Sequence, residues 1–112
     1  MILKTGEKIH VIHRRFFEKE ARRHFIGTVE FYESGVARAS GYVFGIDRVK
    51  FTFERHAELR TRLISIVAGN VLVNVIPDFV NIEAVTYKMV KKNLRVTDGS
   101  DWYLDLSEVT WG

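Results

Sequence analysis

Basic and aromatic side chains gather in one short segment of this chain, residues 13–25, which reads HRRFFEKEARRHF. Proteins that bind single-stranded nucleic acid use aromatic rings to stack on bases and basic side chains to follow the phosphates. The segment therefore predicts a nucleic-acid or anion-binding surface as one hypothesis for function. Its candidate contacts are Arg14, Arg15, Phe16, Phe17, Arg22 and Arg23.

The pairing register of this segment decides how much positive charge it leaves free. Its five basic residues outnumber Glu18 and Glu20 by three, which equals the net charge of +3 of the whole chain. A hairpin centred on Lys19 sets like charges opposite each other, which is unfavourable. A shift in one direction brings arginines face to face, and a shift in the other sets phenylalanines opposite arginines in cation–π pairs. These three registers place Arg15, Arg14 or Phe16, respectively, opposite Arg23.

A single helical turn is a further alternative for this segment, because Glu18 and Arg22 have i, i+4 spacing. Both the cation–π hairpin and the helical turn neutralise part of the segment internally. An edge hairpin protected by charge, which discourages aggregation, is therefore the main alternative to nucleic-acid binding.

The four histidines are predicted to be dispersed and to hold no metal. His10 and His13 form an H-x-x-H pair, which could share a metal on a helix, but the two side chains point to opposite faces of a strand. His24 and His56 are far apart in the sequence. We therefore predict ordinary strand and surface histidines, with neither a metal site nor a cofactor.

Motifs of common enzyme classes are missing from the sequence. The chain has no cysteine, which excludes thiol nucleophiles and zinc–thiolate sites. It also has no phosphate-binding glycine loop, no dinucleotide fingerprint and no nucleophile elbow. Asp98, Asp101 and Asp105 lack the ligand spacing of a calcium loop and are interpreted as a solvated hairpin turn. A non-enzymatic protein is the prediction, with an enzyme site built from scattered residues as an alternative.

Turn residues recur about every ten positions, and β-branched and aromatic residues fill the intervals, a pattern typical of an antiparallel sandwich or barrel. Within the strands, Ile9 and Val11 are expected to share a face, as are Phe25, Val29 and Phe31. We predict strands at 8–13, 24–33, 36–46, 49–55, 61–66, 71–76, 84–90, 94–97 and 101–106, with tight turns at 33–36 and 98–99. In the last of these strands the inward row is predicted to be Trp102, Leu104 and Leu106.

Residues 57–68 allow two interpretations. As a helix, this segment has an apolar stripe that includes Leu59 and Leu63, and the fold is then α+β. As strands, 61–66 and 71–76 form a hairpin around residues 67–70. The β-branched content of both runs favours the hairpin.

The whole chain is predicted to be one domain, residues 1–112, with an all-β fold: a small antiparallel barrel or roll of about eight strands and at most one short helix. No signal peptide and no membrane span is recognised, which predicts a cytoplasmic protein without a membrane partner. The predicted function is a non-enzymatic binding or interaction module. Its tyrosines and tryptophans and its uneven charge distribution predict self-association to a homo-oligomer. A small-ligand-binding barrel is an alternative, which requires an enclosed cavity of at least about 300 Å³ and is ruled out by a filled interior.

Overall fold

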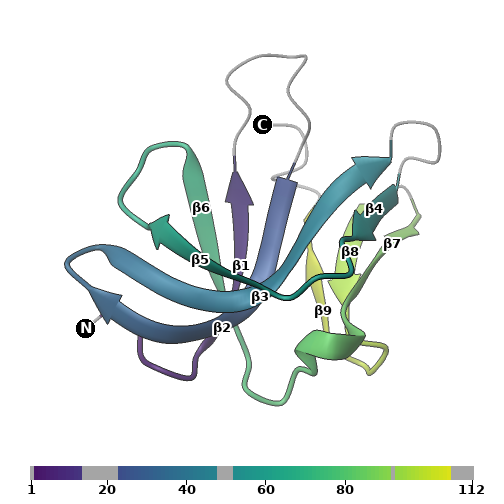
Figure 1. Ribbon diagram of the computed structural model, residues 1–112. Helices are drawn as coiled ribbons and strands as arrows, with labels where there is room; N and C mark the ends of the chain where they lie inside the picture. The colour runs from purple at the N-terminus through teal and green to yellow at the C-terminus, as the bar shows by residue number, and fades with distance from the viewer. Residues whose placement is uncertain (1, 14–22, 48–51, 92, 107–112) are drawn as a thin grey trace.

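The structure is a computed structural model that describes residues 2–13, 23–47, 52–91 and 93–106. Strands dominate these ranges and form two antiparallel sheets (Figure 1). The prediction of an all-β fold is therefore confirmed. The strands are β1 Lys8–His13, β2 Arg23–Glu33, β3 Val36–Asp47, β4 Thr52–Arg55, β5 Arg60–Ser65, β6 Val71–Ile76, β7 Thr86–Val90, β8 Asn93–Thr97 and β9 Tyr103–Asp105.

Helical structure in the described ranges is limited to one 3-10 turn, η1, at Ile82–Ala84. The alternative helix over 57–68 is wrong, because Arg60–Ser65 is a strand. No helix in the ranges given above is long and apolar enough to cross a membrane.

The larger sheet has the strand order β4-β3-β2-β1-β6, and β5 also pairs with β3. One edge of β3 pairs with β5 over Val36 to Gly41 and with β4 over Phe44 to Asp47, while its other edge pairs with β2. Strands β2 and β3 curve together across the molecule (Figure 1). No closed barrel is detected among the strands that the structure describes.

The predicted hairpin between residues 61–66 and 71–76 is wrong in its pairing, although both segments are strands. β5 pairs with β3, and β6 pairs with β1. In these positions Ile64 lies opposite the fully buried Ala37, and Val73 lies opposite the fully buried Val11. Contacts between segments distant in the sequence thus decide the pairing here, and adjacency in the sequence does not.

A glycine pair marks the place where β2 and β3 approach most closely. Gly27 lies directly opposite Gly41 in the ladder. A Cβ atom on Gly41 would lie 2.1 Å from the carbonyl oxygen of Ile26, and one on Gly27 would lie 2.4 Å from that of Ser40. No residue larger than glycine has room at position 41, which is typical of a strand glycine where another backbone approaches closely.

A β-bulge in β2 changes which side chains face the core. The register shifts between Val29 and Phe31, so that Glu30 is the extra residue. Phe25 and Val29 are buried as predicted, but Phe31 is 58% exposed. The prediction that Phe31 shares their face is wrong, because one extra residue turns the following side chains to the other side of the strand.

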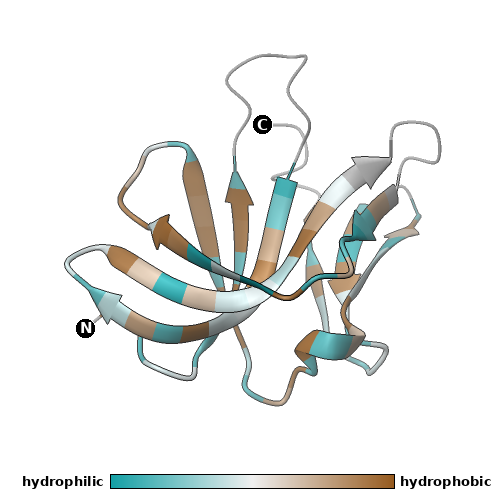
Figure 2. Cartoon of the chain, in the orientation of Figure 1, coloured by the Kyte–Doolittle hydropathy of each residue, from teal (hydrophilic) through white to brown (hydrophobic). Residues whose placement is uncertain are grey.

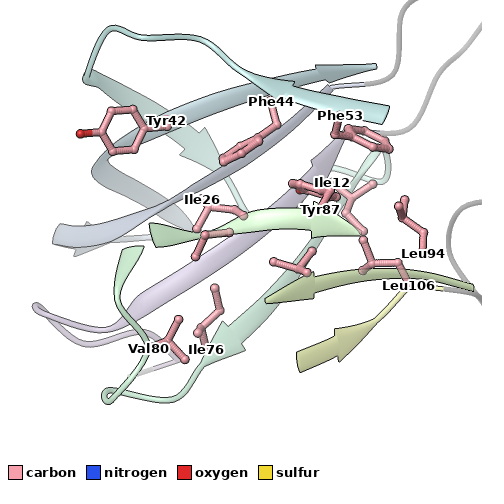
Figure 3. Packing of buried hydrophobic residues seen from close by; sticks show 12 residues of the cluster. Ile12, Ile26, Tyr42, Phe44, Phe53, Ile76, Val80, Tyr87, Leu94 and Leu106 are labelled. Atoms are coloured by element: carbon pink, nitrogen blue, oxygen red, sulfur yellow. The ribbon is translucent and has the colours of Figure 1, made fainter. Parts of the chain in front are cut away.

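The smaller sheet, β7-β8-β9, packs against one face of the larger sheet. In its last strand region Leu106 is buried, Trp102 and Leu104 are half-buried, and Asp101 and Tyr103 are exposed, which confirms the predicted inward row. The core between the two sheets contains Ile12, Ile26, Phe44 and Tyr87 (Figure 3). A second core, with Ile9, Val11, Phe25 and Val29, lies on the opposite face of β1 and β2.

The hydropathy pattern follows this division. Apolar residues recur along β1 and β2 (Figure 2), as expected for strands that bury residues on both faces. The predicted tight turn at Ser34 and Gly35 is confirmed, since both have positive φ angles of 48° and 82°. Such angles are typical of the two-residue turn that joins twisted antiparallel strands.

Candidate functional site

The arginine-rich segment lies mostly outside the described residues. Arg14, Arg15, Phe16, Phe17 and Arg22 are among the residues of which the structure gives no description. Arg23 is described, as the exposed first residue of β2. It pairs with His13 on β1 and with Gly45 on β3. None of the three predicted registers is therefore correct at Arg23, because the pairing is shifted further toward the start of the chain.

A small basic surface surrounds this end of the sheet. The side chain of Arg62 on β5 comes within electrostatic reach of His13. Partial burial lowers the pKa of His13, and the positive charges of Arg62 and Arg23 lower it further. We call His13, Arg23 and Arg62 the basic rim. Neither arginine has a carboxylate within ion-pair distance in the part of the chain that the structure describes.

A buried polar network occupies the core between the two sheets. His10 Nε2 lies 2.9 Å from His24 Nδ1 and 3.1 Å from the Tyr87 hydroxyl. His24 Nδ1 lies 2.8 Å from the same hydroxyl. The exposed fractions of the three residues are 0%, 4% and 8% for His10, His24 and Tyr87. Three polar groups of different strands therefore meet in a region that excludes water.

Strand register brings the two histidines together. His10 pairs with Ile26 and His24 pairs with Ile12, so the histidines are diagonal neighbours on one face of the β1–β2 ladder. Diagonal neighbours are within reach of aromatic side chains. Tyr87 approaches the same face from β7 of the smaller sheet and lies beside Ile12 and Phe53 (Figure 3). His13 is exposed on the opposite face from His10, as the strand prediction requires.

Burial keeps His10 and Tyr87 of this network neutral. Desolvation lowers the pKa of His10 to about 4 and raises the pKa of Tyr87 well above its usual value. The side-chain amide of Asn74 donates to His10 Nδ1 at 3.2 Å, which leaves the hydrogen of the neutral ring on Nε2. In this arrangement the Nε2–H of His10 faces both His24 Nδ1 and the Tyr87 oxygen.

Aromatic rings cover the network. The Phe53 ring stacks on Tyr87 with a centroid distance of 4.6 Å and an interplanar angle of 21°, and its centroid also lies 4.6 Å from that of His24. The Phe44 ring contacts Tyr87 at 5.0 Å. These contacts hold the Tyr87 ring of the smaller sheet against the larger sheet. The same group of aromatic rings borders a pocket.

The pocket is open to one side, has a volume of about 410 Å³ and lies where β3 and β4 meet η1 and β7, so it is not the enclosed cavity that a ligand-binding barrel requires. Its size is within the range of small-molecule sites, roughly 300–1,000 Å³. Aromatic and aliphatic side chains form most of its wall, and the charged groups are one arginine and one glutamate. The lining residues are Phe44, Phe53, Arg55, Glu83, Ala84, Val85, Thr86 and Tyr87.

The charged groups of the pocket are held by neighbouring residues. The Tyr42 hydroxyl donates to Glu83 Oε2 at 2.8 Å, and this hydrogen bond is the main cause of the raised pKa of Tyr42. The Arg55 guanidinium lies 4.7 Å from the centre of the Tyr42 ring and donates to the Glu83 carbonyl oxygen at 2.8 Å. Within the described ranges no carboxylate forms an ion pair with Arg55. Its remaining donors are therefore available for an anionic group.

Comparison of the chain with protein-family models, with curated proteins and with solved structures found no match. We therefore infer the function from the geometry of this molecule.

Sequence reasoning missed both the pocket and the histidine network. The four histidines were expected to be dispersed, but His10 and His24 meet. The signal was present in the strand prediction for 8–13 and 24–33, because an antiparallel register that pairs position 10 with position 26 makes these histidines diagonal neighbours. The position of Tyr87 could not be found in this way, since it depends on how the second sheet docks.

Proposed function

We propose that this chain is a non-enzymatic binding module, a small β-roll that holds a small planar ligand in the pocket between β3–β4 and η1–β7. The observation that carries the proposal is the pocket itself: about 410 Å³, with an aromatic wall and one arginine that lacks an ionic partner among the described residues. Ligand sites of this kind combine apolar walls with a few polar groups that fix orientation.

The wall chemistry indicates the ligand class. Phe44, Phe53 and Tyr87 are nearly buried, but each lines the pocket, so a flat aromatic ring can pack against the parts of these rings that face it. Arg55 supplies a guanidinium that matches a carboxylate in geometry and charge. The Glu83 carboxylate already accepts a hydrogen bond from Tyr42, which reduces its repulsion of an anion. The pocket therefore fits an aromatic carboxylate better than an aliphatic amine.

An aromatic carboxylate such as 2-naphthoate is expected to bind one equivalent per chain, measured by isothermal titration calorimetry in the presence of EDTA. The variant Ala84→Trp places a large side chain at the pocket wall and should weaken binding at least about 10-fold, since bulk in a filled site costs roughly 1–3 kcal/mol. Ser65→Trp is the matched control, because Ser65 is exposed on β5 and is not among the residues that line the pocket.

Two results would contradict this proposal. One is the absence of binding by the unmodified protein at millimolar 2-naphthoate. The other is an equal affinity of Ala84→Trp and Ser65→Trp, which would place the ligand elsewhere. The neutral amide of the same ring, 2-naphthamide, tests the role of Arg55 and should bind about 10-fold more weakly.

The basic rim favours a second candidate function, the binding of nucleic acid. Arg62 adds a positive charge from a separate strand to the pair His13 and Arg23, at the base of the segment 14–22. In the sequence this segment contains three more arginines, Arg14, Arg15 and Arg22, and residues 13–25 are the most basic stretch of the chain.

If the rim binds nucleic acid, the double variant Arg23→Gln/Arg62→Gln should weaken binding to a single-stranded oligonucleotide. The slope of log K against log salt concentration should also fall by about 1–1.5, because two phosphate contacts are lost. Fluorescence anisotropy at several salt concentrations measures both quantities, and Arg38→Gln on the exposed face of β3 is the control. A failure of the unmodified protein to bind DNA or RNA at low salt would end this hypothesis.

A further inference from the structure

Three potential metal-ligand atoms converge behind the pocket wall. His10 Nε2, His24 Nδ1 and the Tyr87 oxygen form a triangle with sides of 2.9, 3.1 and 2.8 Å. They come from three strands, β1, β2 and β7, which belong to both sheets. All three residues are buried, so they meet in the interior of the protein and not on a solvent-exposed surface.

Hydrogen bonding explains only some of the three short contacts in this triangle. Each imidazole nitrogen either carries a hydrogen or offers a lone pair, and the phenol has a single hydrogen. If one imidazole nitrogen donates and the other accepts, two hydrogens are present for three short contacts. If both donate, two N–H groups face each other across 2.9 Å, and if both accept, two lone pairs do so. At most two sides of the triangle can therefore be complete hydrogen bonds.

We propose that His10 Nε2, His24 Nδ1 and the Tyr87 oxygen bind a first-row transition-metal ion. An ion near this triangle interacts favourably with all three donor atoms at once. Donors about 2.1 Å from a metal and at right angles to one another are about 3.0 Å apart, whereas the tetrahedral angle sets them about 3.4 Å apart. The observed sides of 2.8 to 3.1 Å match the right-angled, facial arrangement.

This geometry and these donors narrow the class of ion. Imidazole nitrogen suits copper, iron, nickel and zinc, while right-angled donors belong to square or octahedral coordination and not to the tetrahedral sites of structural zinc. The site therefore fits Cu²⁺, Ni²⁺ or iron. In the bound state the phenol proton leaves to solvent, and the resulting phenolate offsets one positive charge of the ion in the buried site.

Asn74 can accept the hydrogen bond from the second ring nitrogen of His10 that such a site needs. Metal-binding histidines commonly donate their second ring N–H to a neighbouring acceptor, which fixes the ring. The Asn74 amide lies 3.2 Å from His10 Nδ1. When Nε2 binds the ion, Nδ1 carries the hydrogen, and a half-turn of the Asn74 amide presents its oxygen as the acceptor.

The test is a titration of EDTA-treated and then chelator-free protein with Cu²⁺, with glycine present as a weak competitor and no aromatic carboxylate. The expected result is uptake of one equivalent and a visible phenolate-to-copper charge-transfer band. Tyr87→Phe keeps the ring and removes the oxygen, so it should lose the band and bind at least about 100-fold more weakly. His13→Gln, on the opposite face of β1, should change neither quantity.

A second variant keeps the proposal falsifiable if Tyr87→Phe does not fold. Asn74→Ala, at a half-buried position on β6, should weaken Cu²⁺ binding about 10–100-fold through loss of the outer contact. The proposal is overturned if the unmodified protein takes up no stoichiometric Cu²⁺ against glycine. It is also overturned if the charge-transfer band persists in Tyr87→Phe or if His13→Gln alone abolishes uptake. Because 2-naphthoate binding is measured in EDTA, the ligand pocket and the metal site are tested independently.

Discussion

Gly41→Ala is expected to lower the free energy of unfolding by about 3 kcal/mol or more. The new Cβ would lie 2.1 Å from the Ile26 carbonyl oxygen and 2.4 Å from the Gly27 Cα. Both are backbone atoms of the neighbouring strand, so no rotation of a side chain can relieve the overlap. Overpacking in a dense core commonly costs about 1–3 kcal/mol, and a backbone clash in the central ladder is at the upper end of this range or beyond it.

Urea denaturation followed by circular dichroism measures this effect. The matched control is Gly69→Ala, because a Cβ at Gly69 meets no atom within 4 Å. Its free energy of unfolding should stay within about 0.5 kcal/mol of the unmodified value. A loss of less than about 1 kcal/mol in Gly41→Ala would show that β2 and β3 do not approach as closely as described.

Acid is expected to destabilise the metal-free protein through His10. Desolvation lowers the pKa of His10 from 6.5 in the unfolded chain to about 4 in the folded protein. Between these two values the unfolded chain binds the proton more strongly, so the stabilising contribution is present above pH 6.5 and is lost as the pH falls toward 4. A difference of that size corresponds to about 3 kcal/mol.

The groups that face His10 cannot compensate its charge. They are His24 from β2, Tyr87 from β7 and Asn74 from β6, and no described carboxylate is hydrogen-bonded to the ring. Urea denaturation in EDTA at pH 7 and at pH 4 measures the loss of stability. In His10→Gln this loss should be about 3 kcal/mol smaller than in the unmodified protein, even if the variant is less stable at pH 7.

Carboxyl groups of the protein also bind protons as the pH falls from 7 to 4. The prediction therefore concerns the difference in the loss of stability between the unmodified protein and His10→Gln. His56→Gln, at an exposed position between β4 and β5, is the control and should show the same loss as the unmodified protein. An equal loss in the unmodified protein and in His10→Gln would contradict the buried, neutral state of His10.

The sequence predicted the strands well because their alternating pattern is a local property. Leu106 is buried where the pattern placed it, and Ile9 and Val11 share a buried face as predicted. The pattern failed at Phe31, because the bulge inserts one residue and reverses the alternation that follows. The bulge cannot be recognised from the alternating pattern of β2 alone, because it is defined by the pairing of β2 with β3.

Strand pairing and the candidate sites were harder to predict because they depend on distant contacts. The β-branched runs around Ile64 and Val73 are strands, but each joins a different central strand. The contact between His10 and His24 follows from the register of β1 and β2. The position of Tyr87 beside them follows from the docking of the second sheet. The pocket beside Tyr87 depends on the same docking, and no motif in the sequence encodes it.

The central claim, that the pocket between β3–β4 and η1–β7 binds a small aromatic anion, is tested most directly by an NMR titration of the ¹⁵N-labelled protein with 2-naphthoate. The predicted result is a saturable shift of backbone amide signals confined to Phe44, Phe53 to Arg55 and Glu83 to Tyr87. A titration without shifts at millimolar ligand, or with shifts centred on His13, Arg23 and Arg62, would contradict it.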